Sequence, residues 1–174
     1  MSEAFRNNFS QKVDGKARVS IPAAFRRVLE AGDPNYSEKS RPRVALVFGD
    51  ETRKFLECYT IAGMRRLERR INRMHPGDPR RIYLTRNVTS LSAEVEIDDD
   101  GRIVLPPRGR DKLGLGASKE GVEAVFAGTL DTFQIWSTEG WAADLAAQAA
   151  IAKELLAPGQ DMMSLLPEDD EPEE

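Results

Sequence analysis

The chain has very few of the residues on which metal and redox chemistry depend. Its 174 residues include one cysteine, Cys58, and one histidine, His75. A single cysteine excludes a disulfide framework within the chain. No set of histidine, cysteine and carboxylate residues has the spacing of a metal site. We therefore expect no metal, no cofactor and no enzymatic activity.

Long apolar runs are also missing. No stretch approaches the roughly 20 apolar residues that span a bilayer. Residues 1–18 contain no apolar run of signal-peptide length. The sequence thus predicts a cytoplasmic protein without a membrane partner, and it shows no motif for a small-molecule substrate.

Charge is present in quantity but is unevenly distributed. The net charge is −4, yet residues 157–174 alone carry seven acidic residues and no lysine or arginine. Residues 1–156 therefore carry +3, and residues 1–27 carry +4. This is the pattern of a basic body with an acidic tail. Because the tail is acidic and contains proline, we expect it to be disordered.

The most informative feature that the sequence does contain is an internal repeat. The residue pattern of the segment from Asp14 to Pro22 is repeated 84 positions later in the segment from Asp98 to Pro106. Both copies read Asp, three residues, Arg, a β-branched residue, one residue, an aliphatic residue and Pro. Arg26 and Arg110 keep the same shift. A repeat of this length predicts two copies of one structural unit, and a fixed arginine in each is typical of a binding surface.

Hydropathy patterns predict the same order of elements in each copy: strand, strand, helix, hairpin, helix. The strands are expected at residues 5–13, 18–21, 44–48, 55–59, 92–98, 102–105, 122–127 and 132–136, and the helices at 23–29, 61–74, 80–87, 106–113 and 141–156. Val47-Phe48 aligns with Val125-Phe126 at a shift of 78, and Leu56 with Phe133 at a shift of 77. The fold class is therefore α+β and β-rich.

The predicted boundaries are a first unit at 1–64, an Arg-rich helical connector at 65–88, a second unit with a C-terminal helix at 89–156, and the tail at 157–174. The connector has the densest positive charge of the chain, with eight arginines against Glu68 and Asp78. Runs of charge on a helix are usually a solvated face, or they form salt bridges, here to a neighbouring subunit or to the acidic tail. We favour these interpretations over DNA contact.

The residues of the repeat resemble the MraZ family of bacterial transcriptional regulators. The resemblance covers about residues 5–141 and rests on both motifs in the right order. These are Asp14, Lys16, Arg18 and Pro22 with Phe25-Arg26, then Asp98, Gly101, Arg102 and Pro106, with matches at Phe5-Arg6, Tyr59, 81–86 and 134–136. It implies two fused, pseudo-symmetric units of the swapped-hairpin SpoVT/AbrB type. It also implies a ring-shaped homo-oligomer that binds double-stranded DNA at repeated promoter sites of the division and cell-wall gene cluster.

Two positions depart from the family pattern. Ala17 stands where the family usually has glycine, and Asp100 stands where the first copy has Lys16. If the position of Ala17 needs a positive φ, alanine is strained there. The first turn carries two cations and one carboxylate, whereas the second carries one cation and three carboxylates. The first copy is therefore the better candidate for DNA, and the second for a scaffold or subunit contact.

The spacing of Asp and Arg that both copies of the repeat share has two interpretations. The carboxylate can orient the guanidinium toward phosphate or guanine, or Asp14–Arg18 and Asp98–Arg102 can be structural ion pairs that fix the turns. The resemblance favours DNA contact for Arg18. The predicted DNA-binding residues are Arg6, Lys16, Arg18 and Arg102, with Lys16 and Arg6 on phosphates. Asp14, Asp98, Gly101, Pro22 and Pro106 are expected to shape the motif.

The predicted function is therefore sequence-specific DNA binding by a nucleoid-associated regulator. An alternative is an antitoxin-like DNA-binding module whose acidic tail binds a partner protein. A purely structural oligomer is the third class.

Overall fold

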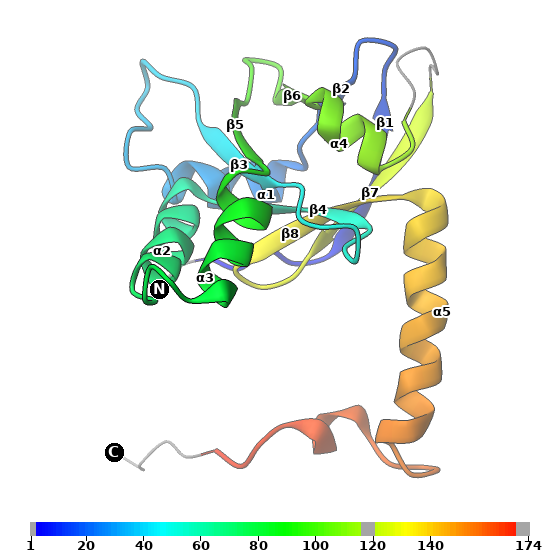
Figure 1. Ribbon diagram of the computed structural model, residues 1–174. Coiled ribbons are helices and arrows are strands. Elements are labelled where there is room, and N and C mark those ends of the chain that lie inside the picture. Colours follow the sequence, from blue (N-terminus) through cyan, green and yellow to red (C-terminus); the bar gives the residue numbers. More distant parts are fainter. Residues whose placement is uncertain (1–2, 116–120, 170–174) are drawn as a thin grey trace. The chain divides into compact units, whose positions relative to one another are not determined.

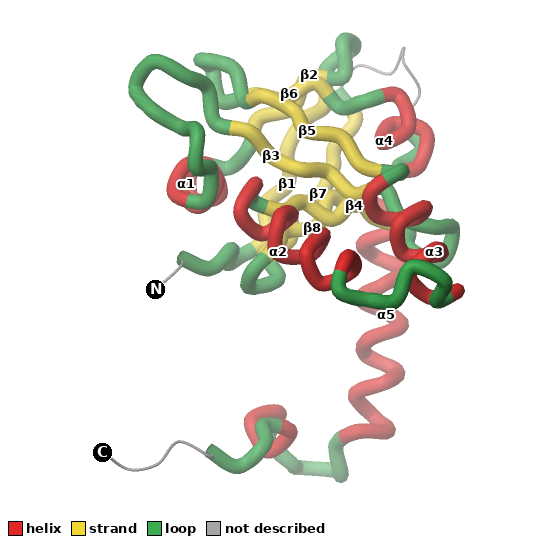
Figure 2. The backbone as a smooth tube through the Cα atoms, turned by 60° about the vertical axis from the view of Figure 1, so that its left-hand side comes forward, coloured by secondary structure: helices red, strands yellow, loops and turns green. Residues whose placement is uncertain are grey.

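The computed structural model describes residues 3–115 and 121–169. Residues Met1–Gly140 form one compact unit and Trp141–Glu174 a second. The first unit contains one antiparallel sheet of eight strands within the described residues, in the order β5-β3-β4-β8-β7-β1-β2-β6 (Figures 1 and 2). The strands are β1 (Asn8–Val13), β2 (Arg18–Ser20), β3 (Arg43–Val47), β4 (Phe55–Tyr59), β5 (Ser92–Glu96), β6 (Arg102–Val104), β7 (Val122–Gly128) and β8 (Thr132–Ser137).

Four helices flank this sheet at the positions expected from sequence. They are α1 (Ala23–Ala31), α2 (Ile61–Asn72), α3 (Pro79–Leu84) and α4 (Pro107–Lys112), and a π-helical turn, η1 (Thr85–Thr89), continues α3. The Thr60 hydroxyl accepts a hydrogen bond from the Gly63 amide and so caps α2. Pro22 and Pro106 each occupy the residue before a helix, in extended backbone.

The two copies of the repeat meet in the pairing of β2 with β6. Val19 lies opposite Ile103, Arg18 opposite Val104 and Ser20 opposite Arg102. Beyond the strands, the Ile21 amide donates to the Gly101 carbonyl and the Leu105 amide to the Ala17 carbonyl, both at 2.9 Å. Each contact maps onto the other when the copies are exchanged. A pseudo-twofold axis therefore passes through the Val19–Ile103 pair.

The repeats interlock rather than folding side by side. β1 of the first copy pairs with β7 of the second, and β4 pairs with β8. Asn8 lies opposite Ala127, and its counterpart Ser92 lies opposite Val47. Val47 therefore corresponds to Ala127, so the alignment of Val47 with Val125 was wrong by two residues. A slip of two keeps every side chain on its face, which is why hydropathy did not reveal it.

The main hydrophobic core lies against the inner face of the sheet, and aromatic rings form its centre. Phe25 is fully buried, and its ring contacts those of Phe5, Phe9 and Phe133 at centroid distances of 4.9–5.4 Å. A smaller cluster packs α2 and η1 onto β3. The predicted core residues are confirmed, since each is at most 6 % exposed: Val19, Ile21, Ile103, Leu105, Phe133, Ile135 and Trp136.

The second unit contains most of helix α5 (Thr138–Leu155) and a short 3-10 helix, η2 (Met162–Leu165). None of the α5 residues is buried. The predicted acidic tail thus includes a helical turn, and its last five residues lie outside the described part. The domain boundaries at residues 64, 88 and 156 stay predictions.

Truncating the central aromatic ring tests this core. We expect Phe25→Ala to lower the free energy of unfolding by about 3–5 kcal/mol, because the change leaves a cavity among three other rings. Urea denaturation followed by circular dichroism measures it. The control is Ile82→Ala on the surface of α3, which should change the free energy by less than about 0.5 kcal/mol. Equal effects of the two variants would contradict the assignment of the core.

Candidate nucleic-acid interface

The two turns of the repeat have the same backbone structure. The Ala17 amide donates to the Asp14 carbonyl at 3.0 Å, and the Gly101 amide donates to the Asp98 carbonyl at 2.9 Å. The last turn residue is left-handed in both, with φ of 60° at Ala17 and 77° at Gly101. This is a three-residue hairpin loop in which glycine is preferred at that position. The expected strain at Ala17 is therefore present in the structure.

Each turn is held by the carboxylate of its first residue. Asp14 Oδ1 accepts from the amides of Lys16 and Arg18, both at 2.9 Å. Asp98 Oδ1 accepts from the amides of Asp100 and Arg102 at 2.9 and 3.0 Å. The hydrogen bond from the arginine amide is the main cause that lowers the pKa of each aspartate below its usual 3.8. Both carboxylates therefore stay ionised and hold the backbone of the turns.

The two arginines differ in their side-chain partners. Arg18 Nε donates to Asp14 Oδ2 at 2.7 Å. The matching side-chain pair of Asp98 and Arg102, which the structural interpretation of the motif requires, is replaced by another, because Arg102 Nη2 donates to Asp100 Oδ2 at 3.0 Å. Asp100 occupies the position of Lys16 and offers a carboxylate two residues away. Arg102 Nε is left buried without a hydrogen-bond partner.

The outer face of the β2·β6 ribbon carries both arginines. Alternation along the strands turns Val19 and Ile103 inward, and these side chains are 1 % exposed. Arg18 and Arg102 point outward at diagonal positions, since Arg102 lies two residues from the partner of Arg18. Diagonal neighbours are about 7–8 Å apart. A two-stranded ribbon of this kind has the dimensions to enter the major groove of DNA.

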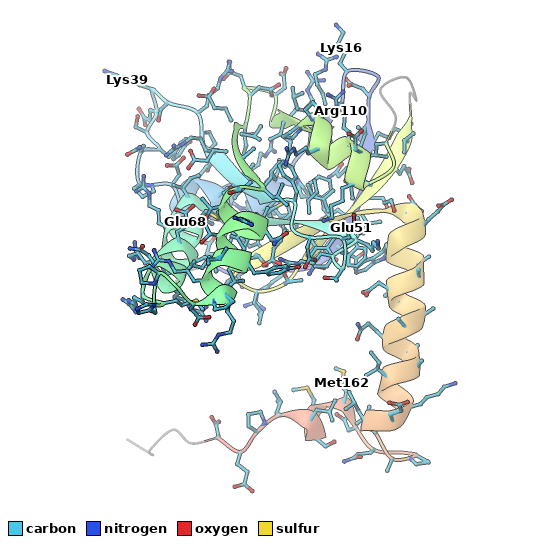
Figure 3. All side chains as sticks on the ribbon, in the orientation of Figure 1. Lys16, Lys39, Glu51, Glu68, Arg110 and Met162 are labelled. Atoms are coloured by element: carbon cyan, nitrogen blue, oxygen red, sulfur yellow. The ribbon has the colours of Figure 1, made fainter. Side chains whose placement is uncertain are left out.

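The other predicted contacts lie at different places. Lys16 is exposed at the tip of the first turn, next to Arg18, and points away from the body (Figure 3). Arg6 is also exposed, but it precedes β1, whose six residues separate it from the turn. At 3.3 Å per residue this separation is about 20 Å. In the structure, Lys16 therefore lies beside Arg18, whereas Arg6 lies away from both.

Arginines from elsewhere in the chain surround the second turn. Arg26 on α1 lies over Gly101, where an added Cβ would be 1.6 Å from its Nη1 atom. Arg41 Nε pairs with Asp99 at 3.3 Å. A cavity of about 430 Å³ separates α1 and the loop before β3 from this turn. No sequence pattern predicted the contact between Arg41 and Asp99, because the two residues are 58 positions apart.

The prolines connect the strands of the motif to these helices. The Pro22 carbonyl accepts from the Arg26 amide and the Pro106 carbonyl from the Arg110 amide, both at 3.0 Å. With φ of −51° and −59°, the two prolines end β2 and β6 in the same way. Each proline therefore positions a helix arginine relative to the ribbon.

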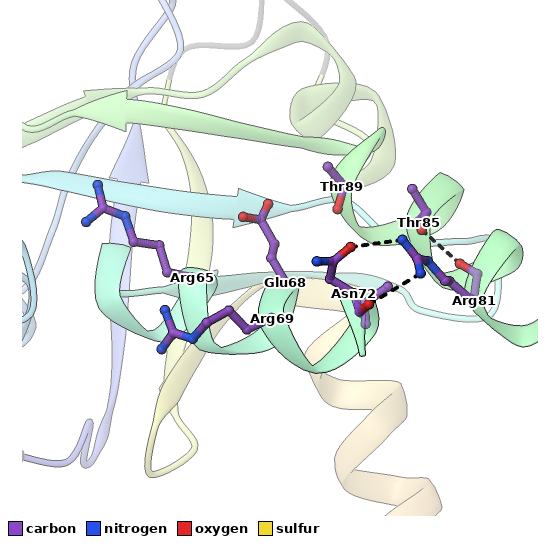
Figure 4. A pocket seen from close by; sticks show the side chains of 8 residues that line it. Arg65, Glu68, Arg69, Asn72, Arg81, Thr85 and Thr89 are labelled. Atoms are coloured by element: carbon purple, nitrogen blue, oxygen red, sulfur yellow. Dashed lines mark hydrogen bonds between the residues drawn. The ribbon is translucent and has the colours of Figure 1, made fainter. Parts of the chain in front are cut away.

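The arginines of α2 and of the residue that follows it form a separate basic surface. All five are exposed, and they form no ion pair with any described residue: Arg65, Arg66, Arg69 and Arg70 on the helix and Arg73 just after it. Arg65 and Arg69 line a shallow pocket of about 450 Å³ beside Glu68 and Asn72 (Figure 4). Arg81 closes one side of it by donating to Asn72 Oδ1 at 2.9 Å. This exposure agrees with the predicted solvated helix face.

The residue types that commonly bind metals or act as nucleophiles form no such site in the described part of the chain. The described residues contain no group of His, Cys, Asp and Glu that could hold a metal ion. Burial raises the pKa of the Cys58 thiol well above its usual value, so this thiol is unreactive. None of the helices in the described part combines the length and apolarity that crossing a bilayer requires.

The curated relatives match most of the length of this chain. It is 55 % identical over 170 residues to the "Transcriptional regulator MraZ" of Cereibacter sphaeroides, covering 97 % of this chain and 98 % of the relative. The chain belongs to the MraZ family. MraZ regulators of Ruegeria pomeroyi and Thermomicrobium roseum are 40 % identical over 172 residues (99 % of this chain, 94 % of the relative) and 31 % identical over 146 (84 % and 90 %). The family model "MraZ protein, putative antitoxin-like" matches residues 91–161.

Membership confirms the resemblance carried by the two motifs. MraZ proteins are named as transcriptional regulators, so this chain is a transcriptional regulator and not an enzyme. The ribbon and its turns are the part of this MraZ chain where its repeated arginines meet.

The backbone of the second turn gives a direct test of the site's construction. We expect Gly101→Ala to lower the free energy of unfolding by about 1–2 kcal/mol, because an L-residue is strained at φ 77°. Urea denaturation measures the effect. The double variant Gly101→Ala, Arg26→Ala should keep most of this loss, because the strain is in the backbone. Full recovery in the double variant would show instead that contact with Arg26 is the cause.

Proposed function

We propose that the chain regulates transcription by binding specific DNA sequences with the outer face of its β2·β6 ribbon. The observation that carries this proposal is the diagonal placement of Arg18 and Arg102 on one outward face, related by the pseudo-twofold axis. An active site would instead bring different chemical groups together. Paired arginines on an exposed ribbon suit the acceptor atoms of DNA.

Arg18 is the principal contact in this proposal. Its Nε is held by Asp14, which orients the guanidinium, and no hydrogen bond to a described residue uses its Nη atoms. A fork held in one orientation loses little rotamer freedom on binding guanine O6 and N7 or a phosphate. Lys16, exposed beside it, is a phosphate contact that positions the duplex without reading its sequence.

Arg102 and Arg6 have secondary parts. Arg102 shares its face with Arg18, but its guanidinium is paired with Asp100, so it contributes less. Arg6 lies about 20 Å from the first turn, a length that corresponds to about six base pairs of B-DNA. It reaches phosphates only at a distant point of the same duplex. The first turn therefore makes the main DNA contacts, and the second turn acts mainly as a scaffold.

The wider setting of the proposal follows the family resemblance. The chain assembles into a ring-shaped homo-oligomer in the cytoplasm and binds repeated promoter sites of the division and cell-wall gene cluster on the nucleoid. Each subunit binds weakly, and simultaneous contacts to several repeats add avidity. Binding is largely electrostatic and falls steeply as salt concentration rises.

Replacing Arg18 tests the proposal. The probe is a fluorescein-labelled duplex of the region just upstream of the chain's own gene, and fluorescence anisotropy gives its Kd at several salt concentrations. We expect Arg18→Ala to raise Kd at least tenfold, because a bidentate contact is worth about 1–3 kcal/mol. Size-exclusion chromatography with light scattering should show an unchanged oligomer.

The matched control is Arg73→Ala at the C-terminal end of α2, just after its last residue, which removes an exposed arginine far along the chain from the ribbon. Its Kd should stay within about twofold of the wild-type value. An Arg18→Ala protein that binds the duplex as tightly as the wild type would refute the assignment of this residue. A wild-type protein that binds no duplex even at low salt would refute the proposed function.

A second candidate is an antitoxin-like module whose tail holds a partner protein. Four apolar side chains of the tail favour it, because they are between 51 % and 69 % exposed: Met162, Met163, Leu165 and Leu166. Purification from the native host distinguishes the two candidates. A stoichiometric small protein that is lost when the chain is truncated after Leu156 supports the antitoxin-like function, and its absence supports the regulator alone.

A further inference from the structure

The two helix arginines of the repeat meet different surroundings. Arg26 lies directly over the second turn, and Gly101 makes this possible because it has no Cβ. An added Cβ there would be 1.6 Å from Nη1 and 2.7 Å from Cζ of Arg26. Arg26 therefore covers the backbone of the second turn with its guanidinium.

The counterpart of Arg26 under the pseudo-twofold axis is Arg110, and the counterpart of Gly101 is Ala17. Both helices follow the same strand and proline, with the same hydrogen bond from arginine amide to proline carbonyl. The symmetry therefore directs Arg110 to the first turn. There, the methyl group of Ala17 occupies the space that the guanidinium of Arg26 fills at the second turn. Arg110 cannot take the same covering position.

The surroundings of Arg110 agree with this displacement. Its Nε is buried and has no hydrogen-bond partner, although the residue as a whole is partly exposed. No ion pair with a described residue involves its guanidinium. No hydrogen bond to a described residue uses the terminal nitrogens of Arg110 either, so these N–H groups are left for a ligand that supplies oxygen atoms. Figure 3 shows Arg110 on α4, below the turn that carries Lys16.

The charge around the two turns follows the same difference. Among the residues that the structure describes, the first turn has the cations Lys16, Arg18 and, by symmetry, Arg110, against the single carboxylate Asp14. The second turn has three arginines against three carboxylates: Arg26, Arg41 and Arg102, and Asp98, Asp99 and Asp100. The second turn is thus neutral within the chain. The first turn has two cations in excess, which an external polyanion can neutralise.

We infer that Arg110 is a further DNA-contacting residue, which binds a backbone phosphate beside the contacts of Lys16 and Arg18. This inference rests on the proposed function. The two terminal nitrogens of a guanidinium donate to two oxygens of one phosphate, an arrangement that arginine provides and lysine does not. DNA binding then completes the hydrogen bonding that the free protein leaves open. Arg26 has no such role.

The test compares Arg110→Ala with the symmetry-matched control Arg26→Ala. The probe is the fluorescein-labelled duplex from upstream of the gene, and anisotropy gives Kd between about 50 and 200 mM salt. We expect Arg110→Ala to raise Kd about tenfold and to reduce the slope of log K against log salt by about one. Arg26→Ala should change Kd less than twofold.

Three outcomes decide the matter. A duplex that wild type binds and Arg110→Ala binds equally well overturns the inference while leaving the proposed function intact. Equal losses in Arg110→Ala and Arg26→Ala overturn it too, because they show no difference between the turns. Failure of the wild type to bind refutes the proposed function itself. Should Arg110→Ala fail to fold, as judged by circular dichroism, Arg110→Gln keeps the stem and removes the charge, and the same expectations apply.

Discussion

The pairing of β2 with β6 is the interaction on which the rest of the structure depends. It joins the two copies of the repeat through Val19 and Ile103, and two reciprocal hydrogen bonds extend it to Gly101 and Ala17. Because the pairing is antiparallel and centred on one residue pair, it places the two turns at opposite ends of one ribbon. The inward side of that ribbon contributes to the core, and the outward side is left for arginine.

Symmetry in the backbone does not bring symmetry in chemistry. The same turn is built twice, but glycine in one copy admits a covering arginine, and alanine in the other excludes it. Three carboxylates neutralise the cations of the second turn, whereas the first turn keeps an excess of positive charge. A repeated fold can in this way assign scaffolding to one copy and ligand contact to the other with a few substitutions.

Local features of this chain were predictable from sequence, and long-range ones were not. The motif predicted the strands, the helices that follow the prolines and the core position of Val19, because each depends on neighbours within a few residues. For residue 17 it gave a positive φ only as a condition, which the structure meets. The pairing of Val47 escaped prediction, since a shift of two residues preserves the faces of a strand. The Arg41–Asp99 contact and the isolation of Arg6 depend on how distant segments meet. The partner of Arg102 depended on which of several nearby carboxylates its side chain reaches.

The most direct test of the account is to cleave DNA from the outer face of the ribbon. Ser20 is exposed on that face, directly opposite Arg102 and two residues from Arg18. Because Cys58 is buried, an iron chelate that generates hydroxyl radicals can be attached selectively to Ser20→Cys. The same chelate on Arg73→Cys, just after α2, serves as the reference. The account predicts strand cleavage at the bound repeats from the Ser20 position and little from the Arg73 position. Cleavage from Arg73 with none from Ser20 would contradict it.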